Sequence, residues 1–145
     1  MHFMKEDQLF YVGQKAFIWK EDKILVLGNP HGNLDFPGGK IQESENDLIE
    51  SLKREVKEET GLEIRVGKPF FTWVLVLPSH HKNAGMKVFL IGYQCEYISG
   101  EVKLSDEHDK FNWVSKENYL DYKKDSRYFE ALETAIKMRG VGKQG

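Results

Sequence analysis

The chain has 145 residues, which fits one domain, and it carries a formal net charge of −2 with a sequence pI of about 6.2. This charge balance argues against a concentrated basic surface, so we expect no nucleic-acid partner. The only cysteine, Cys95, excludes an internal disulfide and a cysteine-rich zinc site. No apolar run approaches the roughly 20 residues of a membrane span, so we expect a cytoplasmic protein without a membrane partner.

Short apolar runs separated by turn signals predict most of the strands. These runs cover residues 9–20, 24–27, 64–66, 70–77, 87–97 and 111–114. The first two are expected to form a hairpin, and 70–77 is expected to pair with 87–97. Residues 28–33 have the composition of a loop, and Cys95 reads as a buried residue within a strand.

Two segments have helical patterns. A helix is expected from about Asn46 to Thr60, with Ser44 or Asn46 as its N-cap and Gly61 as its stop. A second helix is expected over residues 126–139, where apolar residues recur at helical spacing. Residues 1–8 and the tail after about 140 are expected to be loose. Strands mixed with separated helices favour an α/β (α+β) class, a mixed sheet with helices on its faces.

Three glutamates converge on the first predicted helix. Glu55, Glu58 and Glu59 stand at i, i+3 and i+4, so they lie within about 100° of arc. Carboxylates in one patch repel each other unless they are solvated or share a cation. A plain Glu/Lys-rich surface helix would satisfy the first condition, and the three glutamates alone do not exclude it.

The position of Glu59 favours the cation. Leu52 and Val56 belong to the apolar stripe of the helix, and Glu59 lies three residues after Val56. It therefore points towards the protein, where an unpaired charge is costly. Clustered oxygen ligands suit Mg²⁺, and Mn²⁺ as an alternative.

This segment resembles the signature of the Nudix hydrolase superfamily. That signature is a glycine, five residues, a glutamate, seven residues and then Arg-Glu-apolar-x-Glu-Glu-x-Gly-apolar. Residues 54–62 match the second half throughout, and Gly39 and Glu45 match the first half. Eight residues separate Glu45 from Arg54 instead of seven, so spacing from Arg54 would give Asn46 in place of Glu45.

The resemblance implies one Nudix domain over residues 1–145, with its box at 39–62 and an α/β/α sandwich fold. It implies Glu55 and Glu59 as metal ligands, Glu58 as a further ligand or catalytic base, and Arg54 as the residue that orients them. The Pro-Gly-Gly turn brings backbone beside this helix. The residues expected to contact substrate there are Gly38, Gly39 and Lys40.

Residues outside the box are weaker candidates. Glu107, in an acidic loop before Trp113, is a candidate base or metal ligand, and a solvated loop is an equal alternative. His108 beside it is expected at the surface. Phe36 and Trp73 are candidates for stacking on a base, although packing in the core is the commoner role of such residues.

The resemblance implies a Mg²⁺-dependent pyrophosphohydrolase that cleaves a diphosphate linkage in a small nucleotide through attack of an activated water on phosphorus. A Nudix-fold protein that binds nucleotides without turnover is the main alternative. Dinucleoside polyphosphates and ADP-ribose stay open as substrates, the latter because Pro78 lies 16 residues after Leu62. An isomerase is disfavoured by the mid-strand place of Cys95. The sequence leaves a homodimer open.

Overall fold

The computed structural model describes residues 6–28 and 33–142, so residues 1–5 and 143–145 of the predicted loose ends and residues 29–32 of the predicted loop at 28–33 lie outside the described residues. Of the rest of those ends, residues 6–8 form no helix or strand, whereas residues 141–142 belong to a helix. In chain order the elements are β1 (Phe10–Lys20), β2 (Lys23–Gly28), β3 (Leu34–Asp35), β4 (Gly38–Lys40), α1 (Leu48–Thr60), β5 (Glu63–Val76), β6 (Lys87–Ser99), β7 (Lys110–Val114), the 3₁₀ turn η1 (Tyr119–Tyr122) and α2 (Arg127–Gly142).

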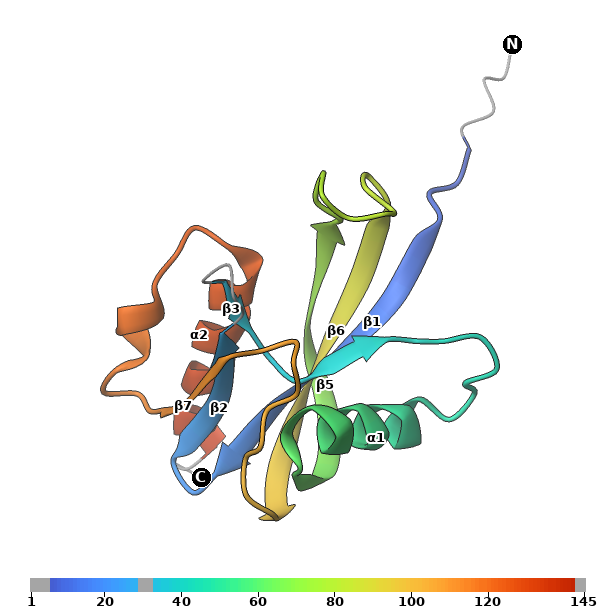
Figure 1. Cartoon of the computed structure of the whole chain (residues 1–145). Coiled ribbons are helices and arrows are strands. Elements are labelled where there is room, and N and C mark those ends of the chain that lie inside the picture. The colour runs from blue at the N-terminus through green and yellow to red at the C-terminus, as the bar shows by residue number, and fades with distance from the viewer. Residues whose placement is uncertain (1–5, 29–32, 143–145) are drawn as a thin grey trace.

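The strands form a mixed sheet, as predicted. Its order is β3-β2-β1-β6-β5, with β4 also paired to β1 and β7 paired to β2. β1 runs parallel to β6 and the other pairs are antiparallel, including the predicted β1–β2 hairpin and β5–β6 pair. In Figure 1, β1, β5 and β6 extend together beyond the helices, and β2, β3 and β7 gather on the other side of the molecule.

The alternation of side chains along β1 separates two cores. Phe17 and Trp19 pack with the α2 residues in one cluster, whereas Ala16 and Ile18 pack with the α1 residues in the other. Neighbouring residues of a strand point to opposite faces. The two helices therefore cover opposite faces of the sheet, which is the expected α/β/α sandwich (Figure 1).

Three local predictions need correction. Helix α1 begins at Leu48, and its N-cap is Asp47, whose Oδ1 accepts from Glu50 N at 3.1 Å, not Ser44 or Asn46. The strands expected at 64–66 and 70–77 are one strand, because β-bulges between Val66 and Phe71 let β5 keep pairing with β6. Helix α2 continues to Gly142.

Other local predictions are confirmed. Gly61 ends α1 in the left-handed conformation, with φ of 79°, and its N–H donates to Lys57 O. Cys95 lies on β6 with only 1% of its surface exposed.

No helix within the described ranges is long and apolar enough to cross a membrane.

Candidate active site

Glu59 connects helix α1 to the first residue of β4, Gly38. It is 7% exposed, and its Oε2 accepts a hydrogen bond from Gly38 N at 2.8 Å. Gly38 has φ of 149°, and a Cβ there would lie 1.9 Å from Gln14 O, so only glycine fits this turn. Burial, together with nearby Glu107, raises the pKa of Glu59 to about 7 against the opposing effects of the Gly38 N–H and Lys15.

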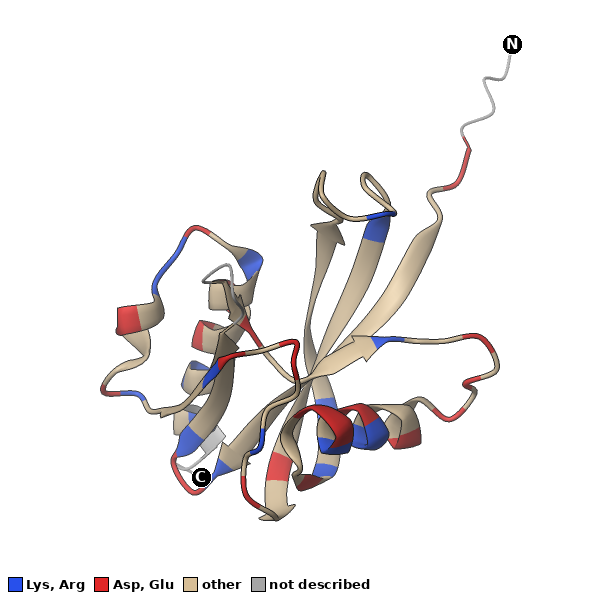
Figure 2. Ribbon diagram, viewed as in Figure 1, with Lys and Arg blue, Asp and Glu red and all other residues tan. Residues whose placement is uncertain are grey.

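Arg54 is the centre of an ionic cluster on α1. It binds Glu45 at 2.7 Å, Glu55 at 3.2 Å and Glu58 at 3.0 Å. Figure 2 shows the acidic and basic residues gathered along this helix. The extra residue of the box lies in a loop where Ser44 takes φ of 74°, and the Glu45 carboxylate still reaches Arg54. Hydrogen bonds from Ser51, Arg54 and the Gln42 N–H lower the pKa of Glu45 to about 2.

Glu55 packs against the glycine turn from the other side. A Cβ on Gly39 would lie 2.9 Å from Glu55 Oε2, so this glycine permits the close approach of carboxylate and backbone. Burial raises the pKa of Glu55, against the opposing effect of Arg54. Gly38 is therefore required by the backbone of β1, whereas a larger residue at position 39 would displace only the end of the Glu55 side chain.

A cavity of about 590 Å³ unites most of the predicted site residues, a volume suited to a nucleotide-sized ligand. The predicted residues that line it are Gly38, Gly39, Lys40, Glu55, Glu59 and Glu107. It is also lined by an aliphatic wall from β5, β6 and the residue after β5. This wall consists of Leu75, Leu77, Val88 and Leu90.

Four predicted site residues do not line this cavity. Arg54 and Glu58 face outward, and both carboxylate oxygens of Glu58 accept hydrogen bonds from Arg54 Nη1, at 3.0 and 3.1 Å. Phe36 is fully buried and stacks on Phe17, with ring centroids 4.0 Å apart. Trp73 is 5% exposed in the same core. A base has no access to such rings, so Phe36 and Trp73 are core residues and their predicted stacking role does not fit.

Sequence reasoning missed a polar group on the cavity wall. Lys15 Nζ lies 3.0 Å from Asp35 Oδ1, and His108 Nε2 lies 2.9 Å from Asp35 Oδ2. The prediction of a surface position for His108 is wrong, because the residue is 7% exposed. A lysine and an aspartate inside otherwise apolar strand segments were the available signals. Tyr128 of α2, which also lines the cavity, left no such signal.

The charges in this group stabilise each other. Burial raises the pKa of Asp35, but Lys15 and the hydrogen bond from His108 outweigh it, and the pKa falls to about 2. Burial lowers the pKa of Lys15, but the charge of Asp35 outweighs it and the net shift is upward. Both groups are therefore ionised at neutral pH. Lys15 also lowers the pKa of Glu59, so it is a cation facing the carboxylates.

The donor set suits a hard divalent cation. Glu55, Glu59 and Glu107 supply carboxylate oxygens around one cavity, and Glu59 is a buried acid whose ionised form a cation would stabilise. In the conformation described for residues 6–28 and 33–142, no three His, Cys, Asp or Glu side chains are close enough to hold a metal ion. Side-chain rotation would be needed to complete a coordination shell.

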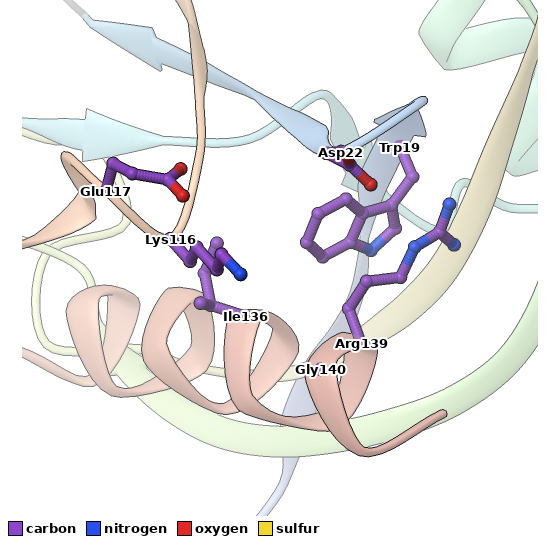
Figure 3. A pocket seen from close by; sticks show the side chains of 7 residues that line it. All are labelled: Trp19, Asp22, Lys116, Glu117, Ile136, Arg139 and Gly140. Atoms are coloured by element: carbon purple, nitrogen blue, oxygen red, sulfur yellow. The ribbon is translucent and has the colours of Figure 1, made fainter. Parts of the chain in front are cut away.

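A second pocket, of about 330 Å³, lies between the end of β1 and α2. In Figure 3, Trp19 and Arg139 lie side by side in it, and Lys116 and Glu117 lie towards its other end. The Arg139 guanidinium binds Glu96 and the carbonyl of Glu21 and lies over the Trp19 ring at 4.8 Å. The guanidinium of Arg139 is therefore already engaged within the protein.

Comparison with known proteins agrees with the box and the fold. The family model described as NUDIX domain matches residues 10–134. The CTP pyrophosphohydrolase of Escherichia coli (strain K12) is 28% identical over 132 residues, covering 87% of this chain and 91% of that protein. The mRNA-decapping enzyme subunit 2 of Saccharomyces cerevisiae (strain YJM789) is 30% identical over 108 residues, covering 73% of this chain. The match spans only 11% of that yeast protein.

Solved structures give the same answer for the fold. The MutT protein from Methanosarcina mazei Go1 has a TM-score of 0.74 at 28% identity, covering 94% of this chain and 99% of that one. The E. coli ORF135 protein has a TM-score of 0.73 at 23% identity, covering 92% and 94%. With the family model matched over most of its length, this chain belongs to the Nudix hydrolase superfamily.

Proposed function

We propose that this protein hydrolyses a diphosphate linkage in a nucleoside di- or triphosphate or a nucleoside diphosphate derivative. The observation that carries the proposal is the buried Glu59, bonded to Gly38 N and sharing one nucleotide-sized cavity with Glu55 and Glu107. The Nudix domain and the resemblance to the E. coli CTP pyrophosphohydrolase support a hydrolase acting on acid anhydrides.

Glu55 and Glu59 would hold Mg²⁺, or Mn²⁺ in its place, and Glu58 is a further predicted ligand once its side chain rotates away from Arg54. Such a cation neutralises diphosphate oxygens and acidifies a coordinated water. Arg54 would keep Glu55 and Glu58 aligned on the helix through its ion pairs. Glu107 would accept the proton of the attacking water, because it is an exposed carboxylate directly beside Glu59.

The remaining cavity residues would orient the substrate. Lys15 and Lys40 would balance the charge of the diphosphate, and Gly38 and Gly39 would present backbone to it. The aliphatic wall would cover the nucleoside. Attack of water on phosphorus would then expel a phosphorylated group, giving for example a nucleoside monophosphate and pyrophosphate.

The proposal extends to partners and location. We expect a small-molecule nucleotide as substrate, no nucleic-acid partner, a cytoplasmic location and a homodimer as an open assembly state. A non-catalytic nucleotide-binding role stays the alternative. It would leave Glu59 without any effect on phosphate release.

A substrate panel tests the proposal. Nucleoside triphosphates, dinucleoside polyphosphates, ADP-ribose and an mRNA cap analogue are incubated with the protein and Mg²⁺, and released phosphate and pyrophosphate are measured. We expect turnover of at least one compound and its loss in Glu59→Gln. No turnover across the panel, with Glu59→Gln behaving like the parent, contradicts the proposal.

A further inference from the structure

The loop that carries Glu107, residues 103–109, is fixed at its two ends by backbone hydrogen bonds. Lys103 N donates to Thr60 O at 2.8 Å, and Ser105 N donates to Glu59 O at 3.1 Å. The other end enters β7, where Lys110 pairs with Gly28 of β2. The stretch between Ser105 and Lys110 therefore runs from α1 to β2 along the cavity, which Glu107 and His108 line.

Electrostatics oppose the inward position of this stretch. Glu107 lines the same cavity as Glu59, and their proximity raises the pKa of Glu59. The two carboxyl groups share a hydrogen bond while one of them is protonated. Once both are ionised they repel each other, and their pairing no longer holds the exposed Glu107 side chain over the cavity. Asp106 and Asp109 are also exposed, so the flanking residues favour the solvent side as well. Some contact must hold the stretch over the cavity.

His108 makes that contact. It is buried although Asp106, Glu107 and Asp109 around it are exposed. Its Nε2 lies 2.9 Å from Asp35 Oδ2. Because ionised Asp35 only accepts hydrogen bonds, Nε2 is the nitrogen that carries the proton.

Asp35 is a rigid acceptor. Its Oδ1 already receives Lys15 Nζ at 3.0 Å and Phe36 N at 2.8 Å, which leaves Oδ2 for His108. The next residue, Phe36, is fully buried, so the backbone at this point is fixed by the core. A side chain anchored to Asp35 is thus anchored to the sheet itself.

We propose that His108 is a positioning residue, whose hydrogen bond to Asp35 holds the Glu107 carboxylate over the cavity beside Glu59. The inference rests on the proposed function, in which Glu107 takes the proton of the attacking water. His108 itself does not touch the reacting atoms. It acts only through Glu107.

Two amide variants of His108 distinguish this positioning role from a role in packing alone. His108→Gln keeps an N–H donor near the place of Nε2, whereas His108→Asn is one methylene shorter and falls short of Asp35. We expect His108→Asn to lower kcat by about 10- to 100-fold with KM changed less than about 3-fold, since small misplacements of a catalytic group have effects of this size. His108→Gln should restore kcat to within about 5-fold of the parent.

A double-mutant cycle with Glu107→Gln provides the sharper readout. If His108 acts through Glu107, adding His108→Asn to Glu107→Gln lowers kcat by less than about 2-fold. Asn118→Ala serves as the structural control, because it removes the bonds from Ser115 N at 2.8 Å and Ser115 Oγ at 3.4 Å in the turn after β7, outside the cavity. It should lower the melting temperature and leave kcat unchanged.

Several results would overturn the inference. They are parent-like kcat in His108→Asn, equal losses in the Asn and Gln variants, or multiplicative losses in the cycle. Should His108→Asn lack a cooperative melting transition, the same cycle is run with His108→Leu, which also lacks a donor and leaves the Lys15–Asp35 pair intact, and multiplicative losses there overturn it too. A parent that turns over no nucleotide contradicts the proposed function and this inference with it, whereas an active parent with an unaffected His108→Asn overturns the inference alone.

Discussion

Two pockets of this protein differ in how their charged side chains are paired. Around Arg139 the guanidinium is matched by Glu96, the Glu21 carbonyl and the Trp19 ring, and only Nε is left without a partner among the described residues. Around Glu59 burial and a second carboxylate raise the pKa of the acid to about 7. The arginine charge of the first pocket is therefore already paired within the protein, whereas the carboxylates of the second pocket retain a charge that a ligand could compensate.

This difference in charge pairing distinguishes a structural pocket from a candidate active site better than pocket volume does. Charges that are matched within the protein need no ligand, whereas strongly perturbed acids mark candidate sites where a cation or substrate supplies the missing interaction. The Lys15–Asp35–His108 group lies between the two cases, because its charges are matched but it lines the cavity with Glu59. Changes in each region should therefore have different consequences.

Removal of divalent metal should have the largest effect. A chelator is expected to reduce turnover to background and Mg²⁺ to restore it, because the carboxylates alone cannot neutralise a diphosphate. Mg²⁺ at 100 times its Kd should also increase the free energy of unfolding of the parent by about 2.7 kcal/mol, and so raise its melting temperature. Undiminished turnover in excess chelator would show that the two pockets do not differ in the way described.

Glu59→Gln should come next, with a loss of roughly 10³-fold in kcat/KM, since it removes the charge but keeps the bond from Gly38 N available. The matched control is Glu63→Gln, which changes an exposed glutamate paired with Lys57 at 2.8 Å, outside the cavity. Steady-state kinetics on the best substrate measure both. Equal activity in the two variants would remove Glu59 from the mechanism.

Asp35→Asn tests the intermediate group through stability. It leaves Lys15 without its anionic partner, and we expect a loss of about 2 kcal/mol in the free energy of unfolding at pH 7, below the value for fully buried pairs. Because the pKa of Asp35 is depressed from 3.8 to about 2, its contribution is complete above about pH 4 and is lost as pH falls through about 2.

Urea titrations of the parent and Asp35→Asn at several pH values provide the measurement. The gap between their free energies of unfolding should be constant from pH 5 to pH 7 and should narrow below pH 4. A gap that widens on acidification would mean that Asp35 is protonated in the folded protein at neutral pH.

Arg139→Met should have the smallest effect. It keeps much of the packing on Trp19 and removes the bonds to Glu96 and the Glu21 carbonyl, at an expected cost of about 1 kcal/mol because Glu96 is partly exposed. Urea unfolding measures this loss, and kcat/KM should match the parent. A drop in kcat/KM near that of Glu59→Gln would make the α2 pocket part of the active site.

Local sequence patterns predicted the part of the site that lies on one helix. Glu55 and Glu59 are placed by helical spacing, and Gly61 ends the helix because it tolerates the left-handed conformation. The burial of Glu59 also follows from spacing, since it continues the stripe of Leu52 and Val56. These properties depend on neighbours within about two helical turns, so a one-dimensional pattern contains them.

Spacing alone could not decide whether Glu45 or Asn46 occupies the first glutamate position of the box. The extra residue before α1 gave two alignments, and the structure decides between them because the left-handed Ser44 lets the loop close and brings Glu45 to 2.7 Å from Arg54. The stacking role considered for Phe36 failed for a similar reason. Whether an aromatic ring faces a cavity or the core depends on which face of the sheet it occupies.

The sequence by itself determined the carboxylate helix, its glycine stop, the box and the family to which they point. Only the tertiary structure decided that Lys15, Asp35 and His108 meet, because they come from β1, β3 and the loop before β7, and no local pattern links such distant segments. The parallel pairing of β1 with β6 likewise joins residues about 77 positions apart. Helical spacing is a property of the chain, whereas the wall of a cavity is a property of the packed sheet.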